Sequence, residues 1–249
     1  MTQLLRPRLL ALNGIFLLDK SIGISSNGAL QRVKRLLQAK KAGHTGSLDP
    51  LATGMLPICF GDATKFSQYL LDSDKTYVVT MQLGVRTTTS DIEGEIVSMR
   101  SVPNFSLDDI NAAFEKFRGT TQQIPSMFSA LKHNGVPLYE YARKGITIER
   151  QSRTLTIYSL IVNSFENNFV NFTVKCSKGT YVRTLVDDVG EKLNCGAHVT
   201  QLRRLSVGPF LENQMMTMEK LDLLTQTENF SVENILLPTT FFSQPMVNS

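Results

Sequence analysis

The sequence predicts a mixed α/β fold of the α+β kind. Segments with the apolar pattern of strands are interleaved with segments that carry helix caps, and no regular strand–helix–strand repeat relates them. The 249 residues are 42% hydrophobic and 19% charged, which suits a well-packed protein of one large or two modest domains. No apolar run approaches the ~20 residues that cross a bilayer, so a membrane-spanning protein is excluded.

The first quarter of the chain predicts a strand, a helix and a loop. Residues 14–19 form a continuous apolar run, which is typical of a buried strand. The Ser-Ser-Asn sequence at 25–27 can cap a helix that reaches Leu37. Residues 43–54 are rich in Gly, Pro, Ser and Thr and have neither helical nor strand periodicity, which indicates a loop.

The next elements follow from caps and alternation. Asp62 is expected to cap a short helix over residues 66–70, and residues 75–84 have the pattern of a strand. Residues 106–109 resemble a capping box for a helix that Gly119 stops.

The second half predicts a long insertion followed by regular elements. Residues 120–152 have little periodicity apart from a short helix at 137–143, and such an insertion in a compact protein is usually functional. The later elements that we expect are strands at 154–162, 169–176 and 198–207, and helices at 180–193 and 217–224.

Positive charge is concentrated near the N-terminus. Residues 1–65 hold nine Lys and Arg against three Asp and Glu, whereas residues 205–249 hold one against five. A localised basic patch is the footprint of a polyanionic partner such as a nucleic acid, although a solvated charged face gives the same pattern. The expected helix and the turn after it supply most of this charge, through Arg32, Lys34, Arg35, Lys40 and Lys41.

The cysteines and the N-terminus favour a reducing cytoplasm. Cys59, Cys176 and Cys195 are odd in number and widely spaced, so neither a disulfide framework nor a zinc site is expected. The apolar run at 9–12 is too short for a secretory signal.

The loop at 43–54 holds the strongest candidate for chemistry. Pro50 restrains Asp49 to an extended backbone, and an aspartate displayed on a Gly-rich loop is a candidate nucleophile or base. A lone Asp-Pro pair more often only caps a turn. The loop is not a P-loop, because the GxxxxGK[ST] pattern is absent.

A series of motifs resembles the pseudouridine synthases of the TruB family, which modify uridine 55 in the TΨC arm of tRNA. The motifs occur in family order: Leu18-Asp19-Lys20, residues 43–54, residues 72–77, Leu83-Gly84-Val85-Arg86-Thr87 with Thr89 and Asp91, Gln123-Ile124-Pro125-Ser126, residues 178–185, and Gln201-Leu202-Arg203-Arg204-Leu205. Ser21 departs from the proline that the family usually has.

The resemblance implies a catalytic domain over residues 1–210 with a central mixed, mostly antiparallel sheet flanked by helices and loops. Within it, residues 120–152 are expected to be a thumb-like insertion that clamps RNA. The tail at 211–249 is expected to be too short for the small β domain of the PUA kind that usually follows in bacteria.

The resemblance also assigns the reactive groups. Asp49 is the expected nucleophile, and Arg183 is expected to pair with it. Tyr77 is expected to stack on the uracil and take part in proton transfer, whereas Tyr181 and Leu202 line the pocket. The reaction is an isomerisation, so no cofactor and no metal is expected.

The remaining assignments concern the RNA. His44 matches the residue that fills the place of the flipped-out base, and an imidazole suits that role because it can stack on bases. The side chains expected to contact RNA, mostly its phosphates, are Lys20, Arg32, Lys34, Arg35, Lys40, Lys41, Lys132 and Arg143, with His133 and Lys144 nearby.

Two other classes of function stay open at this point. A non-catalytic protein that binds or folds RNA would share the basic face without needing Asp49. An enzyme for a phosphorylated small molecule would use the Gly-rich loop, although the sequence lacks both the Walker lysine and a dinucleotide fingerprint. The preferred reading is a cytoplasmic, monomeric enzyme whose partner is the TΨC arm of tRNA.

Overall fold

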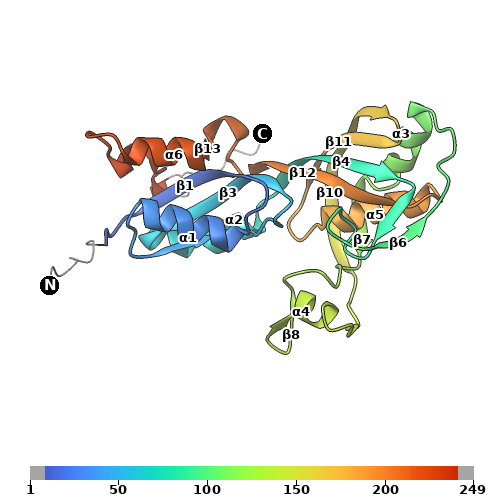
Figure 1. The fold of residues 1–249 in the computed structure, drawn as a ribbon, viewed down its shortest axis with the longest axis horizontal. Helices are drawn as coiled ribbons and strands as arrows, with labels where there is room; N and C mark the ends of the chain where they lie inside the picture. The colour runs from blue at the N-terminus through green and yellow to red at the C-terminus, as the bar shows by residue number, and fades with distance from the viewer. Residues whose placement is uncertain (1–8, 241–249) are drawn as a thin grey trace. The chain divides into compact units, whose positions relative to one another are not determined.

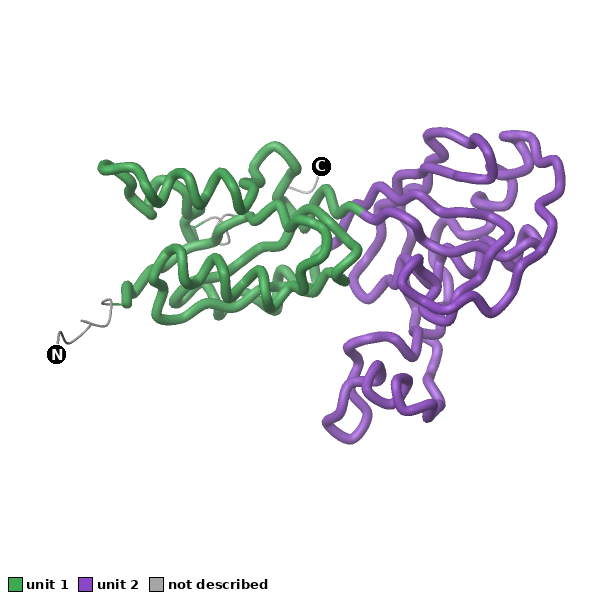
Figure 2. Tube along the Cα trace, viewed as in Figure 1, with its two compact units in different colours: residues 1–73, 203–249 green, residues 74–202 purple. Residues whose placement is uncertain are grey.

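The computed structural model describes residues 9–240, so Arg6 and Arg8 of the basic first quarter lie outside the described residues. The chain divides into two compact units (Figure 2). Unit 1 comprises residues 1–73 and 203–249, and unit 2 comprises residues 74–202. No helix in the described part of the chain is long and apolar enough to cross a membrane.

Unit 1 is built on a mixed group of strands (Figure 1). Strand β1 (Gly14–Lys20) pairs along its length with antiparallel β3 (Thr53–Phe60), and β2 (Ala42–His44) pairs with the far end of β3. Two parallel neighbours complete the group: β13 (Met216–Thr217) beside β1, and the last part of β12 (Ala197–Val207) beside the start of β3. The sequence did not indicate β3.

The helices of unit 1 share a core with the strands. Helix α1 (Ser26–Leu36) has the predicted cap, because the Ser25 side chain accepts a hydrogen bond from the amide of Gly28. Helix α6 (Met218–Thr225) confirms the helix expected in the tail, and its buried Met218 joins the core beneath α1. The shorter helical segments are η1 (Gly61–Phe66), α2 (Ser67–Asp72), η2 (Glu212–Gln214) and η3 (Val232–Ile235).

One expected cap in unit 1 is wrong. The side chain of Asp62 makes no capping hydrogen bond at the start of η1 or α2. Its carboxylate instead forms an exposed salt bridge with Lys65, at 2.7 Å. Asp62 is the second residue of η1 rather than the residue before it, so its side chain does not stand at the capping position.

Unit 2 is an antiparallel sheet with helices packed on it. Its strands follow the order β4 (Lys75–Leu83), β11 (Phe169–Cys176), β10 (Arg153–Glu166) and β7 (Gly119–Gln123), with the first part of β12 next to β4. Val170, Phe172, Val174 and Cys176 are all buried, as the alternation along β11 predicted.

Two helices of unit 2 were predicted closely. Helix α3 (Leu107–Glu115) has the capping box at Ser106 and Asp109, and helix α5 (Val182–Lys192) follows a turn after β11. The predicted mixed α/β class with a mostly antiparallel sheet is therefore confirmed.

Short elements complete unit 2. Strands β5 (Val85–Thr87) and β6 (Ile96–Met99) form a hairpin. The expected insertion at 120–152 is irregular only after residue 123, because residues 120–123 belong to β7 and pair with β10. Its remainder contains the hairpin β8 (Lys132–His133) and β9 (Val136–Pro137), then α4 (Leu138–Ala142), which confirms the short helix expected there. Figure 1 shows α4 and β8 together in one small lobe of the unit.

Candidate active site

Asp49 lies on the loop between β2 and β3 in unit 1. Its side chain is half-buried, whereas Leu48, Leu51 and Ala52 around it are buried. The amide of Ala52 donates a hydrogen bond to the carbonyl of Asp49, at 3.1 Å. The apolar neighbours therefore anchor the loop in the core of unit 1 on both sides of the half-buried Asp49.

Lys20 is a buried cation that is hydrogen-bonded to this loop. It is only 1% exposed, and its ammonium donates hydrogen bonds to the carbonyls of Ile24 (2.7 Å), Ser21 (3.0 Å) and Pro50 (3.4 Å). The amide of Gly23 donates to the same Pro50 carbonyl, at 2.8 Å. The expected contact of Lys20 with RNA is not favoured by this burial, because three carbonyls surround the charge.

Ser26 ties the loop to the start of α1. Its buried hydroxyl donates to the carbonyl of Leu48 at 2.9 Å and accepts from the amide of Leu48 at 2.7 Å. One hydroxyl thus holds both polar groups of the residue that precedes Asp49.

His44 ends β2, five residues before Asp49. Its ring is half-buried, and Nδ1 is buried with no hydrogen-bond partner within residues 9–240. Burial lowers the pKa of the imidazole below 6.5, and the positive charge of Arg204 lowers it further. The ring is therefore neutral at pH 7, which suits stacking on a base.

Arg204 of β12 is a buried cation beneath the same loop. It is 2% exposed, and its guanidinium donates to the carbonyl of Met55 from Nε (2.7 Å) and to that of Gly46 from Nη2 (2.8 Å). Sequence reasoning placed Arg204 in a motif but gave it no role. Two adjacent arginines in that motif are the signal that was available.

Unit 2 holds Arg183 on the first turn of α5. The side chain is buried, and Nη1 donates to the carboxylate of Asp91 (3.1 Å) and to the carbonyl of Thr89 (3.0 Å). Nη2 donates to the carbonyl of Phe128 in the insertion, at 2.9 Å. The direction of this guanidinium is thus set by three groups from outside its own helix.

Asp91 is the carboxylate that sequence reasoning missed. It is 2% exposed, and its second oxygen accepts from the Thr89 hydroxyl (2.6 Å) and from the Glu93 amide (3.0 Å). Thr89 and Asp91 stand two residues apart in one of the family-like motifs, which is the only signal that the sequence offered.

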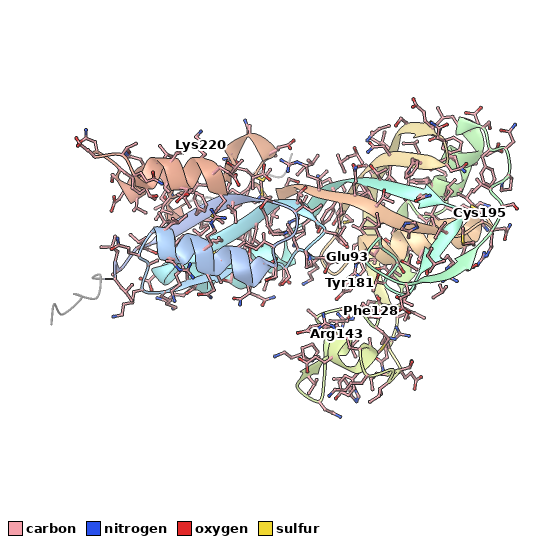
Figure 3. The ribbon with its side chains drawn as sticks, in the orientation of Figure 1. Glu93, Phe128, Arg143, Tyr181, Cys195 and Lys220 are labelled. Carbon is pink, nitrogen blue, oxygen red and sulfur yellow. The ribbon has the colours of Figure 1, made fainter. Side chains whose placement is uncertain are left out.

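The other predicted residues of unit 2 lie in or beside regular elements. Tyr77 is buried in β4 opposite Val174, and Leu202 is buried in β12. Tyr181 is the residue before α5, and Gln123 of β7 fixes its main chain by donating to its carbonyl (3.1 Å) and accepting from its amide (2.9 Å). Figure 3 labels Tyr181 in this region of unit 2.

The predicted reactive residues therefore come from both units. Asp49, His44 and Lys20 belong to unit 1, whereas Tyr77, Tyr181, Arg183 and Leu202 belong to unit 2. The expected pairing of Asp49 with Arg183 stays a prediction.

The predicted RNA contacts fall into two basic groups. Arg32, Arg35, Lys40 and Lys41 are exposed on α1 and the turn after it, and Lys34 is half-buried. In the insertion, Lys132, His133, Arg143 and Lys144 are exposed. The guanidinium of Arg143, which Figure 3 labels, lies over the ring of Tyr139, 5.2 Å from the centre of that ring. No cluster of metal-ligating side chains occurs among the residues that the structure describes.

Two family models match the chain. The N-terminal domain model of the TruB family pseudouridylate synthases covers residues 34–182, and the C-terminal domain model of tRNA pseudouridylate synthase B covers residues 183–240. The chain is 57% identical to tRNA pseudouridine synthase B of Haemophilus influenzae over 94% of its own length and 75% of that protein. It is 60% identical to the protein of the same name from Vibrio parahaemolyticus, over 86% and 68%.

Solved structures give the same result for the fold. One is the crystal structure of a Cbf5–Nop10–Gar1 complex, with 31% identity and a TM-score of 0.66 over 83% of this chain. Another is an H/ACA RNP bound to a substrate RNA containing 2′-deoxyuridine, with 27% identity and a TM-score of 0.67 over 90%. The chain spans only 52% and 59% of these two proteins.

Proposed function

The chain belongs to the TruB family of pseudouridylate synthases, and from this we propose that it converts uridine 55 of tRNA to pseudouridine. The observation that carries the proposal is the identity of 57% to a tRNA pseudouridine synthase B across nearly the whole chain. The substrate is the TΨC arm of tRNA, and the enzyme acts as a monomer in the cytoplasm.

The reaction exchanges one bond to the base for another. The bond between uracil N1 and ribose C1′ breaks, the base rotates, and C5 joins C1′ while C5 loses a proton and N1 gains one. Substrate and product are isomers, so the atoms and electrons balance without a cofactor. The base must be held between these steps, and a carboxylate nucleophile can hold it covalently.

We assign that nucleophile to Asp49. A half-buried carboxylate on a loop anchored by Lys20 and Ser26 can be presented to a substrate with little freedom of movement. Arg183 is assigned the role of pairing with this carboxylate and keeping it negatively charged. Asp91 is a positioning residue for Arg183, because its carboxylate accepts a hydrogen bond from Nη1 of the guanidinium.

Access to the base requires extrusion from the folded RNA. Flipping a base costs a few kcal/mol, and a group that stacks in the vacated place offsets part of that cost. The neutral ring of His44 is assigned to this task. Tyr77, Tyr181 and Leu202 then form the walls around the extruded uracil.

Backbone contacts are assigned to the two basic groups. The exposed cations of α1 and the turn after it neutralise phosphates, and the insertion at 120–152 closes over the arm with Lys132 and Arg143. Protease cleavage within residues 120–152 should be slower when tRNA is bound. Cleavage at the same rate with and without tRNA would contradict the clamp.

The proposal is tested with a tRNA transcript that carries 5-tritiated uridine. The wild-type chain should release tritium, and Asp49→Asn should lower the rate by at least about 10³-fold while tRNA binding persists. Asp62→Asn is the matched control, because Asp62 is an exposed carboxylate of the same unit that forms a salt bridge with the exposed Lys65.

The same assay separates the other classes of function. Tight tRNA binding by a wild-type chain that releases no tritium would favour a non-catalytic RNA-binding protein. Weak binding that ignores salt concentration would favour an enzyme of small molecules, because RNA binding through phosphates weakens as salt rises.

A further inference from the structure

Arg204 is among the largest fully buried side chains of the described residues. A guanidinium in the interior is costly unless hydrogen bonds compensate its lost hydration. The two carbonyls that it contacts, Gly46 and Met55, stand on opposite sides of Asp49 in the sequence. One side chain therefore fastens both ends of the loop that displays Asp49.

The main chain of Arg204 fixes the same loop a second time. Arg204 pairs with Gly54 in parallel register. Gly54 has φ +95°, and a Cβ there would come within 2.2 Å of the Arg204 carbonyl oxygen. The end of the loop is thus pressed against the backbone of the residue whose side chain holds its beginning.

We propose that Arg204 is a positioning residue for catalysis, which sets the place of the Asp49 carboxylate by holding the Gly46 and Met55 carbonyls. The proposal rests on the proposed function, since it takes Asp49 as the nucleophile. The positive charge of Arg204 also adds to the lowering of the His44 pKa that burial causes, so the same side chain affects both loop residues assigned to the substrate.

The neighbouring arginine provides a matched control. Arg203 donates to both carboxylate oxygens of Asp19, at 2.8 and 2.9 Å, and it pairs with Glu212. None of these contacts lies in the loop at 43–54. Arg203→Met removes the same group from the preceding position of the same strand, and it breaks salt bridges with two carboxylates rather than hydrogen bonds to two carbonyls.

The experiment compares Arg204→Met, Arg204→Lys and Arg203→Met in the full chain. Tritium release is measured in a single turnover at saturating enzyme, tRNA affinity by filter binding, and folding by circular dichroism. Arg204→Met should slow the single-turnover step by about 100-fold, since a displacement of the reacting group by about 1 Å costs this much. Its tRNA affinity should stay close to that of Arg203→Met.

Arg204→Lys should fall between wild type and Arg204→Met, because an ammonium lacks the planar fork that reaches both carbonyls. Arg203→Met should change the single-turnover rate by less than about threefold, as expected for partly exposed ion pairs. A fourth variant, Arg204→Ala, tests chemical rescue: a small guanidinium salt should partly restore its single-turnover rate, and urea at equal concentration should not.

The outcomes separate the two claims. A wild-type chain without tritium release overturns the proposed function. An active wild type with equal rates for Arg204→Met and Arg203→Met overturns the positioning role alone. If Arg204→Met does not fold, Arg204→Lys decides: a wild-type rate overturns the role, and a slower step at unchanged affinity supports it.

Discussion

The two units hold their reactive groups in different ways. In unit 1, Lys20, Arg204 and Ser26 contact the main chain of the loop around Asp49. In unit 2, Arg183 projects from a helix, and the carboxylate of Asp91 contacts the side chain itself. The loop is therefore positioned through its backbone, whereas the cation is positioned through its own charged end.

This difference predicts that substitutions in the two units will lower the stability by different amounts. In unit 1, removing one of the side chains that hold the loop around Asp49 frees part of its backbone. Water can then hydrogen-bond to the carbonyls that are exposed as the loop moves. Removing Asp91 in unit 2 takes one charged partner away from a buried guanidinium, and the helix that carries Arg183 cannot move it into water. Unit 2 should therefore lose more stability for one lost contact.

The largest effect should come from Asp91→Asn. Breaking a buried ion pair by removing one partner costs about 3–5 kcal/mol, because the other charge stays desolvated. We expect the free energy of unfolding, measured in urea, to fall by that amount, with loss of tritium release. Asp187→Asn, which removes a more exposed partner of Arg86, should cost less. Equal losses would contradict the distinction between buried and exposed pairs.

The next effect should come from Ser26→Ala in unit 1. The change leaves the amide and the carbonyl of Leu48 without the hydroxyl that they share, at about 1–3 kcal/mol for a buried group. The rate of tritium release should fall by more than the loss of folded protein accounts for, because Leu48 precedes Asp49. The adjacent helix cap, Ser25→Ala, is the control, and it should cost about 1 kcal/mol without slowing release.

A smaller effect is expected far from either reactive group. Ser106→Ala removes the capping box of α3, which should cost about 1 kcal/mol in thermal or urea unfolding. Tritium release at a temperature where both proteins are folded should not change. A slower release would mean that α3 affects Arg183 through the core of unit 2.

The smallest effect concerns pH. Because the pKa of His44 is lowered in the folded chain, the unfolded chain takes up the proton first as the pH falls below 6.5. The free energy of unfolding should therefore decrease below pH 6.5, and His44→Gln should make that decrease shallower. Identical curves for wild type and His44→Gln would refute the effect.

Most elements were predictable because their signals are local. Serine caps, alternating strands and glycine stops each involve a few adjacent residues, and they located α1, α3, β10 and β11 to within a few residues. Strand β3 was missed because Gly54 and Pro57 lie within it, and both residues weaken a strand pattern.

The residues that hold the reactive groups in place were less predictable than the reactive groups themselves. Asp49 and Arg183 follow from a resemblance to known motifs. The roles of Lys20, Arg204 and Asp91 depend on burial and on partners far away in the sequence, up to 158 residues in the case of Arg204 and Gly46. A charged residue in a sequence is read as exposed, since charges are seldom buried without a partner.

The close approach at Gly54 has a consequence for mutational tolerance. The residue carries no reactive group, yet even a single methyl group would overlap a carbonyl oxygen of the adjacent strand. In a saturation-mutagenesis screen, position 54 should therefore be as intolerant as the aspartate five residues before it. Substitutions of Asp49 should give stable but inactive protein, whereas substitutions of Gly54 should give little folded protein.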